Sequence, residues 1–235
     1  MRLEGLLAMK THFLRYAVIA LIALVPFLPG AAQVSAEPAA TAALSPPTLG
    51  EGAVTNNGLA QRVMLYEEER GNPQGRSAAG TVVWSNETKT SETANIPELV
   101  VRADIDIPER RMEMTWRLRR TTGLSTSHTI EFLFKIPQNF TGGDTFNVPG
   151  IWMKPAERLQ GTALAGLAVK VTAGYFLIEL SAADADKQRN LELLKGRPWI
   201  DIPIVYTNNR RAILAVEKGT AGEQAFQKAF GAWKE

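Results

Sequence analysis

The sequence predicts a mainly β fold, an antiparallel β-sandwich with two late helices, and two observations carry this prediction. Apolar side chains occupy every second position of three stretches, at residues 101–107, 112–118 and 130–136. A period of two is typical of strands that have one buried and one solvent-facing side. Short segments of this kind recur between turn-forming residues, and helical spacing occurs only late in the chain. A single curved sheet backed by the helices is the alternative arrangement.

The N-terminal residues have the composition of an export leader. Basic side chains precede an apolar run over residues 16–28, and small residues then lead to Ala32 and Ala36. A basic start, a short apolar middle and a small-residue exit are typical of a secretory signal peptide. We therefore expect a signal peptide over residues 1–36, with an uncleaved membrane anchor as the alternative.

The rest of the chain divides into a linker and one folded domain. Residues 37–60 are mostly Ala, Pro, Ser, Thr and Gly, and they contain almost no large apolar side chains. Such a segment has little with which to offset the entropy lost on ordering, so a flexible linker is predicted. Residues 61–235 are long enough to bury a core as a single β-rich globular domain.

The folded domain begins with two predicted strands. The first covers residues 61–69 and the second covers residues 80–87. The intervening segment 70–77 and the segment 89–95 are polar, and the first of them contains Gly and Pro. Both are therefore predicted to be loops.

The central hairpin has a register that burial should fix. If Ile107 faces Met112 across the turn at residues 108–111, three more apolar pairs fall on the same face. These pairs are Ile105 with Met114, Ala103 with Trp116, and Val101 with Leu118. A slip by one residue would turn Trp116 into solvent, which disfavours every neighbouring register. The third alternating stretch continues this meander.

A predicted loop over residues 137–147 is followed by several short strands. They are expected at residues 148–154, 162–171, 174–180, 199–207 and 210–216. Asn208 and Asn209 join the last two strands, because asparagine tolerates the positive φ of a tight turn. Pro203 places the earlier strand of that pair at an edge or a bulge.

Helical signatures occur in two late segments. Ser181 is the expected N-cap of a helix near residues 181–195, and Thr220 with Glu223 forms a capping-box pattern before a C-terminal helix. The C-terminal helix has four large or small apolar side chains on one face: Phe226, Ala229, Phe230 and Trp233. We expect this helix to lie on the sheet, and an assembly scaffold that uses it is the alternative.

Charge and composition exclude several function classes. Beyond the leader the chain has equal numbers of basic and acidic residues, so it has no net field for nucleic acid, and no nucleic-acid partner is expected. The chain has no cysteine, which excludes disulfides, thiol catalysis and thiolate metal sites. Contact with a membrane is expected only if the N-terminal segment is uncleaved.

His128 is the only histidine after the leader. Without cysteine or further histidines the usual zinc ligand sets fail, so neither a metal nor a cofactor is expected. A Ser-His-Asp hydrolase would have to use His128, and the chain has no G-x-S-x-G motif. Because His128 shares the inward parity of Ile130 and Phe132, a buried structural role is expected. Catalysis by His128 with a nearby carboxylate, as in a hydrolase or lyase, is the alternative.

The basic residues of the central hairpin are the most suggestive surface feature. Arg117 and Arg119 should project from the same face of a strand, with Arg111 nearby, and could hold a carboxylate, a phosphate or an acidic protein surface. A solvated face whose charges pair with one another is the alternative. Trp152 lies between Pro-Gly and Lys-Pro pairs, and could contact a sugar or a protein or fill the core.

Five short stretches resemble a conserved exported domain of Gram-negative bacteria. They are Val82-Val83-Trp84, Val100-Val101-Arg102-Ala103-Asp104, Ser127-His128-Thr129-Ile130-Glu131, Asn147-Val148-Pro149-Gly150-Ile151 and Arg210-Arg211-Ala212-Ile213-Leu214. The resemblance covers about residues 61–233. That family has no assigned activity, so the resemblance implies a location in the cell envelope and no particular chemistry.

These observations favour an exported, periplasmic binding domain without catalytic activity. Its expected partner is an envelope protein, a glycan or an anionic ligand. The alternatives are the His128 hydrolase or lyase and the C-terminal helical scaffold.

Overall fold

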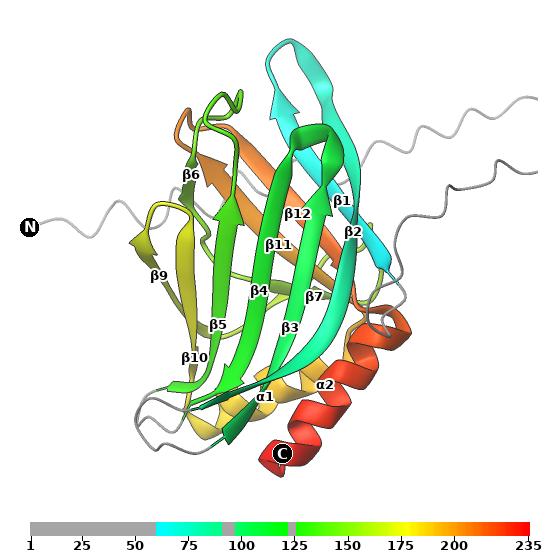
Figure 1. Ribbon diagram of the computed structural model, residues 1–235, viewed down its shortest axis with the longest axis vertical. Coiled ribbons are helices and arrows are strands. Elements are labelled where there is room, and N and C mark those ends of the chain that lie inside the picture. The colour runs from blue at the N-terminus through cyan, green and yellow to red at the C-terminus, as the bar shows by residue number, and fades with distance from the viewer. Residues whose placement is uncertain (1–59, 91–96, 122–125) are drawn as a thin grey trace, which may run out of the picture. The chain divides into compact units, whose positions relative to one another are not determined.

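The computed structural model describes residues 60–90, 97–121 and 126–235 (Figure 1). The predicted signal peptide, and all of the predicted linker except its last residue, lie outside these ranges. The described residues form twelve strands in one sheet. The strands are β1 (Gln61–Glu69), β2 (Asn72–Thr90), β3 (Pro97–Ile107), β4 (Met112–Arg120), β5 (Thr126–Lys135), β6 (Thr145–Asn147), β7 (Trp152–Lys154), β8 (Thr162–Ala163), β9 (Gly166–Thr172), β10 (Tyr175–Ser181), β11 (Trp199–Tyr206) and β12 (Arg211–Glu217).

The predicted mainly β, antiparallel fold with two late helices is confirmed. The strand order is β8-β7-β11-β12-β1-β2-β3-β4-β5-β10-β9, and β6 pairs with β11 beside this path. Because β1 pairs with both β2 and β12, the early and late strands belong to one continuous sheet. The sheet curls until β11 and β12 lie across from β3 and β4, so a core is enclosed between its opposing parts. The curved sheet thus has the layered core of a sandwich.

The predicted register of the central hairpin is also confirmed. Ile107 faces Met112, and the other three apolar pairs follow across β3 and β4. On the next strand, Phe132 faces Trp116. Trp116 is 1% exposed and Phe132 is fully buried, so burial selects this register over a one-residue slip.

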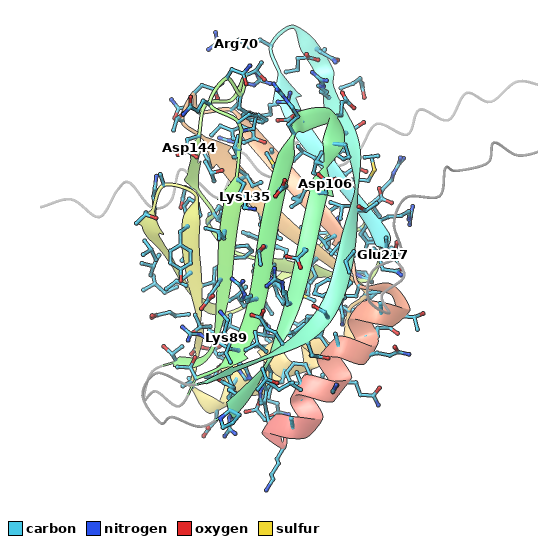
Figure 2. All side chains as sticks on the ribbon, in the orientation of Figure 1. Arg70, Lys89, Asp106, Lys135, Asp144 and Glu217 are labelled. Carbon is cyan, nitrogen blue, oxygen red and sulfur yellow. The ribbon has the colours of Figure 1, made fainter. Side chains whose placement is uncertain are left out.

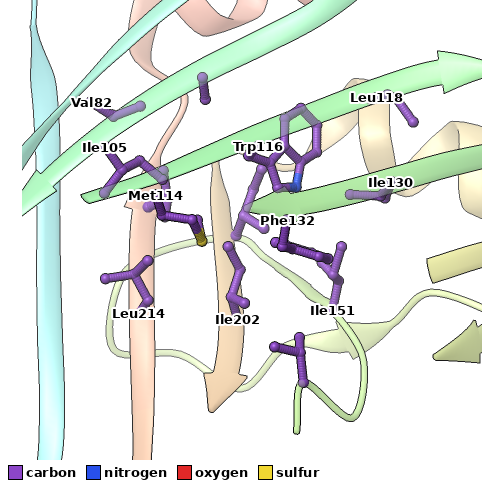
Figure 3. Close-up of a cluster of buried hydrophobic side chains, with 14 of the residues drawn as sticks. Val82, Ile105, Met114, Trp116, Leu118, Ile130, Phe132, Ile151, Ile202 and Leu214 are labelled. Carbon is purple, nitrogen blue, oxygen red and sulfur yellow. The ribbon is translucent and has the colours of Figure 1, made fainter. Parts of the chain in front are cut away.

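The core joins side chains from distant parts of the sheet (Figure 3). Met114 and Trp116 lie on one side of it, and Ile202 and Leu214 from the last two strands lie on the other. Each fully buried large apolar side chain stabilises the fold by about 1.5–3 kcal/mol relative to exposure. The interior space lined by Trp116 and Ile202 is too small for a water molecule.

The hairpin of β1 and β2 is longer than predicted. Most of the expected loop 70–77 belongs to β2, and the turn is at Arg70 and Gly71, where Gly71 has a φ of 82°. Side chains in this part of the hairpin are mostly exposed, so the segment lacks the apolar alternation by which strands are predicted. Backbone pairing, which extends to Glu69 and Asn72 beyond a bulge, forms the strands here.

The two late helices are α1 (Asp184–Gly196) and α2 (Gly219–Trp233), and both lie at one end of the curled sheet (Figure 1). The predicted side-chain caps are wrong. Ser181 ends β10, and its hydroxyl accepts a hydrogen bond from the Ala183 amide, one residue before α1. Thr220 lies inside α2, which begins one residue earlier and has no side-chain cap.

The expectation that the C-terminal helix lies on the sheet is met. Helix α2 packs on β2 and β3, and its apolar face is buried. The Trp84 ring lies 5.5 Å from that of Phe226, and the Trp233 indole N–H donates to the Leu99 carbonyl. Neither helix in the described ranges has the length and apolar composition needed to cross a membrane.

Candidate functional site

His128 is sealed between β5 and the two helices. The side chain is 1% exposed, and its Nε2 lies 2.8 Å from Oε2 of Glu235. The Lys187 ammonium of α1 forms an ion pair with the other oxygen of that carboxylate at 2.9 Å, and the Trp233 ring lies 5.4 Å from the imidazole. The cluster therefore ties both helices to the sheet.

The hydroxyl groups next to His128 in the sequence are engaged in other contacts. Burial lowers the pKa of His128, although the charge and the hydrogen bond of Glu235 oppose this effect. The nearest hydroxyl in sequence, on Ser127, donates to the Ser181 carbonyl at 3.0 Å. Thr129 and Thr121 share a hydrogen bond. The three hydroxyls are thus already hydrogen-bonded, and among the described residues no group of three or more His, Cys, Asp or Glu side chains could hold a metal ion.

Arg117 and Arg119 lie in a network of charges on the outer face of β2 to β5. Arg117 Nε donates to Glu87 at 2.7 Å, and Arg119 Nε lies 3.2 Å from a carboxylate oxygen of Glu131. Arg102 binds the same Glu87 and also Asp104. Burial would raise the pKa of Glu87, but the hydrogen bonds and charges of its arginine neighbours outweigh it and lower that pKa. This geometry corresponds to the alternative of a self-paired face.

Arg111 and Trp152 lie apart from this network. Trp152 is on β7, half-buried, and faces Asp201 of β11 and Ala163 of β8. Arg111 lies at the turn between β3 and β4, next to the short 3-10 helix η2 (Pro108–Arg110). The structure therefore brings Arg117 and Arg119 together and separates both from the other two candidates.

Arg111 lines a groove of about 700 Å³ at the end of β5. The groove lies between the β3–β4 turn, the segment that follows β5 and the β9–β10 turn at Ala173 and Gly174. Lys135 and Asp144, labelled in Figure 2, also line it. No local pattern in the sequence indicates this groove, because its walls come from three separate turns.

A second feature that sequence reasoning missed is an apolar patch on the outer side of β5, β10 and β9. We call it the β9 face, and it consists of Leu133, Leu167, Val169, Tyr175 and Leu177. Cross-strand pairing joins Leu133 to Tyr175 and Leu177 to Val169, and it also places Glu131 beside Leu177 and Glu179 beside Leu167 on the same side. Leu167 is 65% exposed and Leu133 is 41% exposed. Exposed apolar patches on soluble domains often mark interaction sites. The sequence signal for this patch was the apolar side chains at the outward-facing positions of β9 and β10.

The β9 face ends at a free strand edge. β9 is the last strand in the sheet order, and among the described residues no strand pairs with its outer edge (Figure 1). β9 pairs regularly with β10 from Gly166 to Lys170. A bulge follows at Val171, whose side chain is 45% exposed. Lys170 points to the inner side, with its Nζ 5.8 Å from the centre of the Phe176 ring. The edge thus has backbone groups that no described strand pairs with, apolar side chains on its outer side and the positively charged Lys170 on its inner side.

Comparison with known proteins yields no relative: no family model, no curated protein and no solved structure matches this chain.

Proposed function

We propose that this chain is an exported, non-catalytic binding domain that takes an extended segment of a partner protein onto β9 as an additional strand. The predicted export leader and the resemblance to exported Gram-negative domains support a periplasmic location. The single observation that carries the binding function is the free edge of β9 beside the β9 face.

Strand addition follows from the chemistry of the edge. An unpaired edge presents a row of N–H and C=O groups that another strand can satisfy, and the side-chain pockets then select its sequence. The opposite edge of the sheet is β8, which has only two residues. β9 has seven residues, which suffices for a docked strand.

The partner segment should alternate apolar and acidic residues. Its apolar side chains would extend the contacts of Leu167 and Val169, and its acidic side chains would face Lys170 on the inner side. A second copy of this chain fits less well. Antiparallel pairing of two β9 strands about Val169 would place the two lysines at position 170 diagonally on one side, where like charges repel.

A synthetic peptide of alternating valine and glutamate tests this proposal by fluorescence anisotropy with the full chain. We expect saturable binding, and Leu167→Lys should weaken it by at least about tenfold, or about 1.4 kcal/mol. Leu159→Lys is the matched control, because Leu159 is a 57% exposed leucine outside the β9 face. This control should bind like the unchanged chain.

The charge preference has its own test. Lys170→Glu should weaken binding of the valine–glutamate peptide and strengthen binding of a valine–lysine peptide. Absence of binding by the unchanged chain, equal effects of the two leucine substitutions, or no reversal of charge preference would each contradict the proposal.

A further inference from the structure

One wall of the groove at the end of β5 consists of apolar residues. Its wall contains Phe134, which is only 6% exposed, together with Ile136, Pro137 and Ala173. Its volume of about 700 Å³ lies within the range of roughly 300–1,000 Å³ that is typical of small-molecule sites. The groove therefore has room for the apolar body of a small molecule.

Among the residues that the structure describes, the charges along the groove leave one cation, Arg111, without an acidic partner. Lys135 Nζ donates to Glu113 at 3.1 Å, and the carboxylate of Asp144 accepts from the Thr145 amide. Arg111 donates to the amide oxygen of Asn139 at 3.2 Å. Among the described residues, no carboxylate lies within ion-pair distance of Arg111.

The backbone holds Arg111 in an unusual conformation. Its φ of 49° and ψ of 39° are left-handed, a conformation that is sterically unfavourable for a residue with a side chain. Glycine or asparagine is the usual residue in such a position. The preceding Arg110 is anchored inside the sheet, with its Nε 2.7 Å from Glu67 and its Nη2 donating to Thr141. The buried contacts of Arg110 therefore fix the backbone next to Arg111, and the Arg111 side chain lines the groove.

We propose that this groove binds a small amphipathic carboxylate, with its anionic head on Arg111 and its apolar body along Phe134 and Ile136. One of the five N–H groups of the guanidinium is used by Asn139, so the others can hold a carboxylate in a two-bond geometry. Glu113 and Asp144 also line the groove, and their negative charge favours a singly charged carboxylate over a doubly charged phosphate. This site lies apart from the β9 edge and does not depend on strand addition.

Calorimetric titration of the full chain with decanoate, decanol and acetate tests the site. Decanoate should bind with one saturable site, and decanol and acetate should each bind at least about tenfold more weakly, because each lacks one half of the recognised chemistry. Arg111→Asn should weaken decanoate binding by at least about tenfold. Arg70→Asn is the matched control, because Arg70 is exposed at the tip of the β1–β2 hairpin (Figure 2), outside the groove, and should leave binding unchanged.

The choice of asparagine separates binding from folding. Asparagine tolerates the left-handed conformation, so Arg111→Asn should keep or raise the melting temperature while it loses decanoate affinity. The proposal is overturned if decanoate does not bind, if decanol binds as tightly as decanoate, or if Arg111→Asn binds like Arg70→Asn. If the unchanged chain binds decanoate but not the valine–glutamate peptide, the proposed function is contradicted and the proposal for this groove stands.

Discussion

At the scale of single residues, His128 shows burial and charge acting against each other. Desolvation of the imidazole lowers the pKa of His128 from its ordinary 6.5, and the neighbouring Glu235 offsets part of that shift. Lys187 and Arg120 also lie nearby, and their positive charges lower the pKa further. The folded chain therefore takes up the imidazole proton less readily than the unfolded chain does.

This shift predicts a loss of stability in mild acid. Between the folded pKa of His128 and 6.5 the unfolded state binds more protons, so the free energy of unfolding falls as the pH is lowered through this window. Urea denaturation should show lower stability at pH 5.5 than at pH 7.5. His128→Gln keeps an N–H donor for Glu235 without the titration, and should reduce the difference between the two pH values.

The contribution of Glu235 falls in a different pH window. Burial would raise the pKa of this carboxyl, but the hydrogen bond from Lys187 and the charge of His128 outweigh it and lower the pKa below its ordinary 4.5. Its stabilisation is therefore lost only as the pH falls below about 4.5 and through the folded pKa.

The two pH windows keep the His128 prediction testable. If His128→Gln shows the same difference in stability between pH 7.5 and pH 5.5 as the unchanged chain, another group causes the acid sensitivity.

The candidate arginines show what strand parity can predict for individual residues. Parity places Arg117 and Arg119 correctly on the outer face, and the pairing of β4 with β5 puts Glu131 directly across from Arg117. The partnership of Arg117 with Glu87 spans β3, so it depends on the stagger of three strands and on side-chain rotamers. Local pattern contains no information on either. The same holds for His128 and Glu235, which are 107 positions apart.

At the scale of elements, α2 is part of the core. Its Phe230 is 3% exposed and its ring lies 5.3 Å from that of Trp233. Phe230→Ala should lower the free energy of unfolding by about 3–5 kcal/mol, because it removes a large buried side chain and leaves a cavity. Chemical denaturation measures this loss. Lys228→Ala, at an exposed position of the same helix, should change the stability by less than about 0.5 kcal/mol.

This prediction also bears on the assembly-scaffold alternative. If α2 served mainly to join other proteins, its apolar face would be dispensable for folding, and Phe230→Ala would leave the stability close to that of the Lys228→Ala control. Burial of that face on β2 and β3 argues for the opposite result.

The sequence predicts the two helices correctly and their side-chain caps wrongly, and the two kinds of signal differ in strength. Helical spacing is a repeated signal, whereas a cap depends on one side chain that tertiary contacts can replace. Lys218 shows how a distant side chain can serve a helix end, because its buried ammonium donates to the Leu194 and Arg197 carbonyls at the C-terminal end of α1. Burial lowers the pKa of Lys218 to about 8. No pattern in the sequence around residue 196 indicates a cap that comes from residue 218.

At the scale of the whole described domain, the choice between two sheets and one depends on a single long-range pairing. The fold class follows from alternation, which every strand carries locally. Whether the sheet is continuous depends on β1 meeting β12, a pairing of Val63 with Val216 across most of the domain. Alternation does not specify the partner of a strand, so one curved sheet and two stacked sheets predict the same buried side chains.

The same continuity predicts how stability is distributed over the sheet. β4 has a partner on each side and a buried inner face. In the described part of the chain β9 pairs only with β10, and it is exposed over most of its length. Native-state hydrogen exchange should therefore show β4 amides that exchange only through global unfolding, and β9 amides that exchange by local opening at far lower free energy. Adding the valine–glutamate peptide should slow exchange in β9 and leave β4 unchanged. Protection of β9 equal to that of β4 without any peptide would mean that its edge is already satisfied, and would remove the physical basis for strand addition.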